Sequence, residues 1–263
     1  MEENNNPFQA PEADLEIPTD PSMASTYIGP QSRPTGSGVN WISSGYQNFK
    51  ASPGPWLVTM LVGFVIMILI SIIPIIGSLV QMFTTYVWMG GLMLGCQAVS
   101  QGEKMDVNYL FAGFKNKFGQ LLGLSVLVGL VSIAIVFIFV GKVYFDLMFA
   151  GADTVPESFD FMSFMLNMLI VFALMIPLFM AVWFAPALIV LQDMPVVAAM
   201  KASFFGCLKN ILPFLVYGVV MFVLMIIAAL PLFLGFLVVV PIAYASIHAA
   251  YQDIYLKSSE NDL

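Results

Sequence analysis

Long apolar runs without a charged residue make up most of the chain beyond residue 55. A helix needs about 20 residues to cross a bilayer, and a central Asp, Lys or Arg costs roughly 2.5–3.5 kcal/mol on insertion. Four runs meet both conditions: Trp56–Ile76, Leu79–Val99, Phe118–Gly141 and Phe164–Val190. Each of them predicts one membrane-spanning helix.

The last apolar run, Ile211–Gln252, contains 42 uncharged residues and is too long for one span. The sequence Leu230-Pro231-Leu232 lies near its middle, and a proline removes a helix hydrogen bond. We therefore expect two spans joined by a tight turn. The predicted fold is an all-α, polytopic membrane bundle of six transmembrane helices in three hairpins. Without the turn, the count falls to five.

A short amphipathic element precedes each hairpin. The sequences WISSGYQNFK (41–50), VNYLFAGFKNKF (107–118) and MKASFFGCLKNI (200–211) each combine aromatic residues, a glycine and Lys or Asn. In the second element, Asp106 can cap the start of a helix. Hydrophobic residues there recur on one helical face: Val107, Leu110, Phe111, Phe114 and Phe118. We expect three amphipathic helices at the cytoplasmic interface, and we hypothesise a threefold internal repeat.

Composition agrees with this class of protein. Hydrophobic residues make up 60% of the chain and charged residues only 10%, whereas soluble domains carry about 25% charged residues. The net charge of −7 is concentrated at the N-terminus. Residues 1–38 are polar and acidic and predict a disordered tail, residues 39–256 the six-helix transmembrane domain, and residues 257–263 a short C-terminal tail.

Basic residues predict the orientation in the membrane. With six spans, one side carries eight of the nine basic residues: Arg33, Lys50, Lys104, Lys115, Lys117, Lys201, Lys209 and Lys257. The opposite side has Lys142 alone. The positive-inside rule then places both termini in the cytoplasm. No basic run indicates nucleic-acid binding, so we expect no nucleic acid as a partner.

Glycine spacing in GGLMLGCQAVSQGEK suggests helix packing rather than phosphate binding. Gly90 and Gly95 have the first part of a phosphate-loop spacing, but Cys96 stands where that motif requires lysine. Two GxxxG pairs lie in apolar segments, where they allow close backbone approach: Gly91 with Gly95, and Gly119 with Gly123.

Residues with reactive chemistry are few, and we expect neither a cofactor nor an enzyme. Cys96 and Cys207 fit inert buried thiols better than reactive ones. His248 fits an interfacial residue among tyrosines better than a pH sensor or a headgroup ligand. Four carboxylates between the third and fourth spans fit a solvated loop better than a calcium site: Asp146, Asp153, Glu157 and Asp160. No set of residues predicts a metal site.

Two stretches resemble known bacterial membrane proteins. GGLMLGCQAVSQGEKMDVNYLFAGF, with WISSGYQNFKASPGPW before it, resembles an uncharacterised family of BPSS-type transmembrane proteins. FAPALIVLQDMPVVAAMKASFFGCLKN is similar to the membrane domains of some glycerophosphodiester phosphodiesterases and to YciC-like proteins. The resemblance implies a multi-helix bacterial inner-membrane protein without assigned activity. The catalytic domain of those phosphodiesterases has no counterpart here.

Two functions remain open. The first is a non-enzymatic component that organises lipid or partner membrane proteins, with anionic phospholipid headgroups attracted by five lysines: Lys50, Lys115, Lys117, Lys201 and Lys209. The second is a facilitator or exporter of a small neutral or amphipathic molecule, with a cavity formed where Pro177, Pro186 and Pro241 kink their helices. The spans contain almost no ionisable residue, which argues against a proton-coupled carrier.

Overall fold

The computed structural model of the protein describes residues 26–149 and 160–257, and over these ranges the chain is almost entirely helical. The one β-type pairing there is an isolated bridge between Tyr27 and Leu256. The elements in chain order are α1 (Ser37–Ala51), α2 (Pro53–Ser71), α3 (Ile76–Ser100), the 3-10 helix η2 (Val107–Phe111), α4 (Ala112–Lys115), α5 (Phe118–Phe149), α6 (Phe161–Val182), α7 (Ala185–Gln192), α8 (Val196–Lys209), α9 (Ile211–Ala229) and α10 (Phe236–Tyr255).

Six segments of the described chain are long and apolar enough to cross a membrane: α2, α3, the first part of α5, α6 with α7, α9 and α10. This confirms the predicted class, an all-α polytopic bundle with six spans. The turn at 230–235 separates α9 from α10, so the five-helix alternative is wrong. Both Leu232 and Phe233 have positive φ angles, 52° and 66°, which reverse the chain within that turn.

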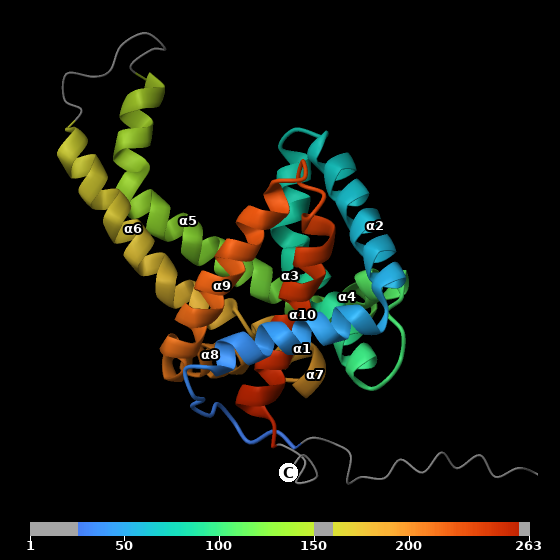
Figure 1. Cartoon of the computed structure of the whole chain (residues 1–263). Coiled ribbons are helices and arrows are strands. Elements are labelled where there is room, and N and C mark those ends of the chain that lie inside the picture. The colour runs from blue at the N-terminus through green and yellow to red at the C-terminus, as the bar shows by residue number, and fades with distance from the viewer. Residues whose placement is uncertain (1–25, 150–159, 258–263) are drawn as a thin grey trace, which may run out of the picture.

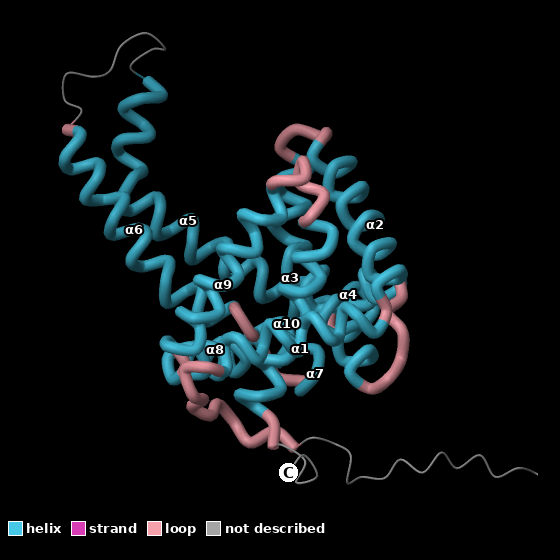
Figure 2. The backbone as a smooth tube through the Cα atoms, in the orientation of Figure 1, coloured by secondary structure: helices cyan, strands magenta, loops and turns pink. Residues whose placement is uncertain are grey.

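Three hairpins, α2–α3, α5–α6 and α9–α10, extend from a base formed by the short helices (Figure 1). The α5–α6 hairpin leans away from the other two. Figure 2 shows the α2–α3 and α9–α10 turns at the same end of the bundle, opposite the base. In α3 and α10, 44% of the residues in the most apolar stretch are buried, against 17–22% in the other four spans. These two helices therefore form the centre of the bundle.

Each short element packs on the second helix of a hairpin. For η2–α4 and α8 this is the hairpin just before them in the chain, and for α1 it is the last one. The η2–α4 segment lies on α3, α8 lies on α6, and α1 lies on α10. The order of a short helix followed by a hairpin thus occurs three times, and α1 closes the ring because it packs on the last span. Glycine makes two of these contacts possible. A β-carbon on Gly45 would stand 2.7 Å from the Ile242 carbonyl oxygen, and one on Gly113 would collide with the Val87 carbonyl.

The second short element differs from the single amphipathic helix expected over 107–118. It consists of η2 and α4, and α4 ends at Lys115 because Asn116 is extended, with φ of −113° and ψ of 121°. Lys117 then adopts a left-handed conformation with φ of 58°. Asp106 caps the start as predicted and accepts a 2.7 Å hydrogen bond from the Asn108 N–H. Leu110 is buried, whereas Phe111 is 37% exposed. The close approach of this segment to α3 therefore determines its shape more than amphipathic periodicity does.

The expected boundary of the N-terminal tail at residue 38 is too late. Residues 26–36 lie along the base, where the Ile28 N–H donates to the Tyr255 carbonyl at 2.9 Å. The Arg33 N–H donates to Asn210 Oδ1 at 2.8 Å, and the Arg33 guanidinium forms an ion pair with Asp253 at 3.0 Å. The folded domain therefore includes this segment. The tail residues 1–25 and the C-terminal residues 258–263 lie outside the described ranges.

The fourth predicted span, Phe164–Val190, is interrupted near its end. The α6 helix ends at Val182 and α7 begins at Ala185, which places Pro186 in the first turn of α7 rather than inside a continuous helix. Ser203 of α8 stabilises the break. Its hydroxyl accepts a 2.9 Å bond from the Phe184 N–H and donates at 2.7 Å to the Met180 carbonyl. The other two prolines, Pro177 and Pro241, lie inside α6 and α10.

Candidate functional site

Lysines at the base differ in what they contact. Lys117 pairs with Asp193, and Lys209 donates a 2.9 Å hydrogen bond to the Pro30 carbonyl. These two therefore stabilise the fold, although the sequence suggested them as lipid contacts. Lys50, Lys115 and Lys201 are exposed and make no ion pair or hydrogen bond within the described chain. Only these three of the five predicted lysines are left for an external anion.

Lys201 lies at a groove between α8 and the second hairpin. The groove has a volume of about 590 Å³ and is lined by Leu127 of α5, Ala181 of α6 and five residues of α8: Val197, Met200, Lys201, Phe204 and Phe205. Lys201 is the one charged side chain in this lining. The groove thus combines an apolar surface, which suits an acyl chain, with an exposed ammonium group, which suits an anionic headgroup.

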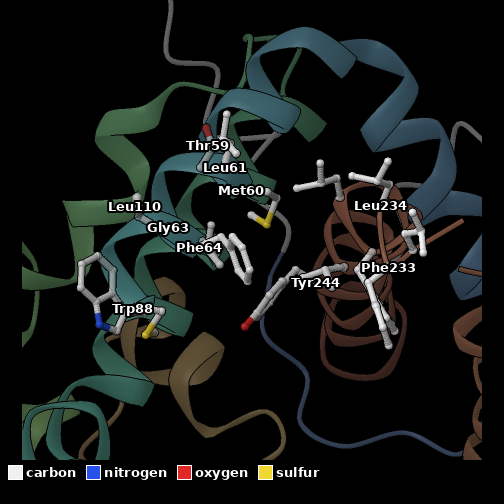
Figure 3. A pocket seen from close by; sticks show the side chains of 16 residues that line it. Thr59, Met60, Leu61, Gly63, Phe64, Trp88, Leu110, Phe233, Leu234 and Tyr244 are labelled. Atoms are coloured by element: carbon white, nitrogen blue, oxygen red, sulfur yellow. The ribbon is translucent and has the colours of Figure 1, made fainter. Parts of the chain in front are cut away.

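A larger cavity of about 740 Å³ lies between α2, α3 and α10 (Figure 3). Side chains of α2, α3, η2, the 230–235 turn and α10 line it: Thr59, Met60, Leu61, Gly63, Phe64, Met67, Trp88, Leu92, Leu110, Leu232, Phe233, Leu234, Phe236, Leu237, Val240 and Tyr244. No charged residue is among them. The Trp88 indole N–H already donates to Thr84 Oγ1 at 3.0 Å.

The position of this cavity differs from the one expected from the kinks at Pro177, Pro186 and Pro241. None of the three prolines lines it, and neither α6 nor α7 contributes a wall. Val240 and Tyr244 do line it, so the cavity lies beside Pro241 alone. Pro177 and Pro186 lie outside this cavity, because α6 belongs to the hairpin that leans away from it (Figure 1). A cavity at these two prolines stays a prediction.

A stripe of polar aromatic residues continues from the cavity along α10 to the base. It recurs with helical spacing i, i+4, i+7 and i+11: Tyr244, His248, Tyr251 and Tyr255. We call this set the α10 stripe. Its periodicity is visible in AYASIHAAYQDIY, but the sequence does not show which helices would face it.

Hydrogen bonds tie three members of the α10 stripe to other helices. His248 Nε2 and Gln97 Oε1 of α3 are 2.8 Å apart, and the Tyr251 hydroxyl accepts from the Gln192 side chain at 2.6 Å. The Tyr255 hydroxyl donates to the Ala202 carbonyl at 3.0 Å. His248 is only 2% exposed. The predicted interfacial histidine is instead a core residue that joins the two central helices.

The two GxxxG pairs differ in their surroundings. A β-carbon on Gly91 would collide with the Tyr109 carbonyl, and one on Gly95 would stand 2.7 Å from the Met105 sulfur. Both glycines thus face the segment that leads into and forms η2. Gly119 has no neighbouring atom within 4 Å, and Gly123 has one, at 3.9 Å. The second pair therefore makes no close helix contact within the described chain.

The remaining candidate residues are the two cysteines and the carboxylates predicted between the third and fourth spans. Cys96 and Cys207 are both buried and unpaired, and burial raises the pKa of the Cys207 thiol to about 12. Asp160 caps α6 and accepts a 3.0 Å bond from the Met162 N–H. The other three loop carboxylates lie outside the described side chains. No group of three or more metal-ligating residues occurs in the described ranges.

Comparison with known proteins supports a membrane location. The chain is similar to a probable inner membrane protein of Burkholderia thailandensis, with 28% identity over 198 residues that cover 72% of this chain and 73% of the relative. No protein-family profile and no solved structure matches the chain. With six apolar helices of spanning length, the similarity supports an inner-membrane protein of an uncharacterised kind. The resemblance to phosphodiesterase membrane domains and YciC-like proteins receives no support.

Proposed function

We propose that the protein is a non-enzymatic inner-membrane component that binds anionic phospholipid at its base. The observation that carries the proposal is the apolar groove with Lys201 at its lining. An acyl chain can pass from the bilayer into the groove at little cost, because both surroundings are apolar. The ammonium group attracts an anionic headgroup with about 1 kcal/mol near the membrane surface.

Two further lysines lie at the ends of short base helices, as Lys209 does in α8, whereas Lys201 lies in the middle of α8. Lys50 lies in the last turn of α1, just before the span α2, and Lys115 lies in the last turn of α4, just before the span α5. Each cation thus stands where a short base helix leads into a transmembrane helix. Anionic headgroups lie at that depth if the base faces the cytoplasm, as the positive-inside rule predicts.

The test neutralises Lys50, Lys115 and Lys201, the three of the five predicted lipid-contact lysines that no described protein group binds. We expect the triple variant Lys50→Gln, Lys115→Gln and Lys201→Gln to bind phosphatidylglycerol at least about tenfold more weakly, because each charge contributes about 1 kcal/mol. Native mass spectrometry of the purified protein, titrated with phosphatidylglycerol and with phosphatidylcholine, measures the difference.

Two matched variants complete this experiment. Arginine at the same three positions keeps the charges and should retain binding. The double variant Lys117→Gln and Lys209→Gln neutralises lysines that the fold already engages, and it should change lipid affinity much less. Equal phosphatidylglycerol binding by the triple glutamine variant and the unchanged protein would refute the proposal.

A facilitator for a small neutral molecule is the second candidate, favoured by the cavity between α2, α3 and α10. Below that cavity, the bonds of His248 to Gln97 and of Tyr251 to Gln192 join α10 to α3 and α7. Passage to the base would require these contacts to separate. Solute release from proteoliposomes that is faster than from empty liposomes would support this function, and equal rates would oppose it.

A further inference from the structure

We propose that the cavity between α2, α3 and α10 binds one uncharged, largely hydrocarbon molecule whose carbonyl or ester oxygen accepts a hydrogen bond from Tyr244. This site lies apart from the lysine groove, since the two share no lining residue. The inference therefore goes beyond the binding of anionic lipid at the base and does not depend on it.

The size and walls of the cavity fit such a molecule. A volume of about 740 Å³ lies within the range of about 300–1,000 Å³ that is common for small-molecule sites. Of the sixteen lining residues, only Thr59, Trp88 and Tyr244 carry a polar side chain. The walls therefore favour hydrocarbon over most of the ligand's length.

Access to the cavity is from the side of the bilayer. On α2, Leu61 is 52% exposed and Phe64 is 60% exposed, although both line the cavity. Across from them, Leu232 of the 230–235 turn is 85% exposed. Figure 3 shows the α2 side chains on one side of the cavity and those of the turn and α10 on the other. A molecule dissolved in the membrane can enter between these two walls without crossing water.

Tyr244 provides the polar recognition. Its side chain lines the cavity, and Figure 3 shows its hydroxyl extending away from α10 on the side of Trp88. Unlike the other members of the α10 stripe, it has no hydrogen-bond partner in the described chain. Tyr244 is half-buried, so its hydroxyl is open to the cavity and free to donate to a molecule that occupies it. A ligand acceptor would satisfy the hydroxyl.

The lining also determines the charge and polarity of the ligand. The absence of Asp, Glu, Lys, Arg and His from the lining means that a charged ligand would be buried without a counter-ion, which is strongly unfavourable. Hydroxyl groups are the free polar atoms of the lining, so a ligand with several polar groups would leave some of them unpaired. A carbonyl or ester oxygen needs only the donor that Tyr244 supplies.

The position of Tyr244 determines how the ligand lies. Tyr244 is eight residues beyond the first residue of α10, Phe236, which corresponds to about 12 Å along the helix axis. The acceptor would therefore lie inside the bundle. The hydrocarbon part would extend along α10 toward the 230–235 turn, where Leu232, Phe233 and Leu234 contribute to the wall.

The experiment uses three photoreactive probes with the same sixteen-carbon chain and the same diazirine: a methyl ester, an alkane and a free carboxylate. Each is titrated against the full-length protein in lipid nanodiscs, and peptide mass spectrometry locates the labelled residues. We expect saturable labelling of α2 and α10 by the ester, and weak labelling of these helices by the carboxylate. Tyr244→Phe should weaken ester binding about three- to tenfold, the usual effect of one hydrogen bond, and leave the alkane unaffected.

A matched pair of glycine variants controls for loss of folding. Gly63 lines the cavity, and a β-carbon there would stand 3.5 Å from Leu110, so Gly63→Leu fills the site without a backbone clash. Gly218 of α9 is exposed and has no neighbour within 4 Å, so Gly218→Leu is the same change outside the cavity. The first variant should abolish ester labelling and the second should preserve it.

Three results would overturn the proposal. These are ester labelling that survives Gly63→Leu, carboxylate binding as tight as ester binding, and no loss of ester affinity in Tyr244→Phe. The triple lysine variant should label normally with the ester. Failure of the anionic-lipid proposal would therefore leave this result unchanged, and the two ideas can be rejected separately.

Discussion

At the scale of single residues, glycine controls how closely the short base helices approach the spans. Gly91 of α3 and Gly113 of α4 face each other, and a β-carbon on Gly113 would stand 3.1 Å from the Gly91 nitrogen as well as collide with the Val87 carbonyl. Both obstacles are backbone atoms, which cannot rotate away. The contact therefore requires glycine for reasons of space, not of backbone conformation.

Gly113→Ala should destabilise the protein by about 1–3 kcal/mol, the usual cost of overpacking. The physical reason is that α4 must move away from α3 to admit the methyl group. A thermal unfolding curve in detergent, followed by circular dichroism, measures the change. Gly119→Ala is the matched control, because nothing lies within 4 Å of that position. Equal unfolding temperatures for the two variants would contradict the role assigned to Gly113.

At the scale of elements, the break between α6 and α7 depends on one hydroxyl. Ser203 is fully buried and bonds both the Phe184 N–H and the Met180 carbonyl. The helix can therefore break between α6 and α7 while both of these backbone groups stay hydrogen-bonded inside the protein. Pro186 then suits the first turn of α7.

Ser203→Ala should cost about 1–3 kcal/mol, since it leaves the buried Phe184 N–H without an acceptor. Unfolding in detergent measures this loss, and enhanced hydrogen exchange at Phe184 would localise it. Ser125→Ala is the control. Ser125 is also buried, but its hydroxyl only donates to the Leu121 carbonyl one turn earlier in the same helix. A loss in Ser203→Ala no larger than in this control would exclude a specific role at the break.

At the scale of the whole molecule, the base gathers the short helices, the first described residues and the last. The Lys257 N–H donates to the Thr26 carbonyl at 3.0 Å, so both ends of the described chain meet there. If the base faces the cytoplasm, the start of α6 at Phe161 lies toward the opposite side of the membrane. This orientation is a prediction from the distribution of lysines.

Cysteine labelling tests the orientation. In intact cells, a membrane-impermeant maleimide should label Asp160→Cys, and it should label Gln101→Cys, an exposed position at the base, only after the membrane is opened. The native cysteines give little background, because both are buried. The raised pKa of Cys207, about 12, also keeps its thiol protonated and unreactive at pH 7–8. The reverse labelling pattern would place the base outside and remove the basis for inner-leaflet lipid binding.

The sequence by itself determined the features that depend on local hydropathy and local hydrogen bonding. Uncharged runs of sufficient length identified six spans, because a charge in the bilayer centre is costly whatever the neighbouring helices are. Pro231 marked the turn between α9 and α10, and Asp106 was recognised as a cap from its position alone. Lysines at the base were also found, but not the fact that Lys117 and Lys209 are already engaged within the fold.

Only the tertiary structure decided the features that depend on which segments meet. Gly91 and Gly119 have the same spacing in sequence, yet only Gly91 has a backbone against it, because Gly119 lies on an exposed face of α5. The cavity combines Thr59, Trp88 and Tyr244 from three helices. No periodicity along the chain shows that these will face one another. Hydropathy acts on one helix at a time, whereas helix packing depends on shape and hydrogen bonding between helices distant in sequence.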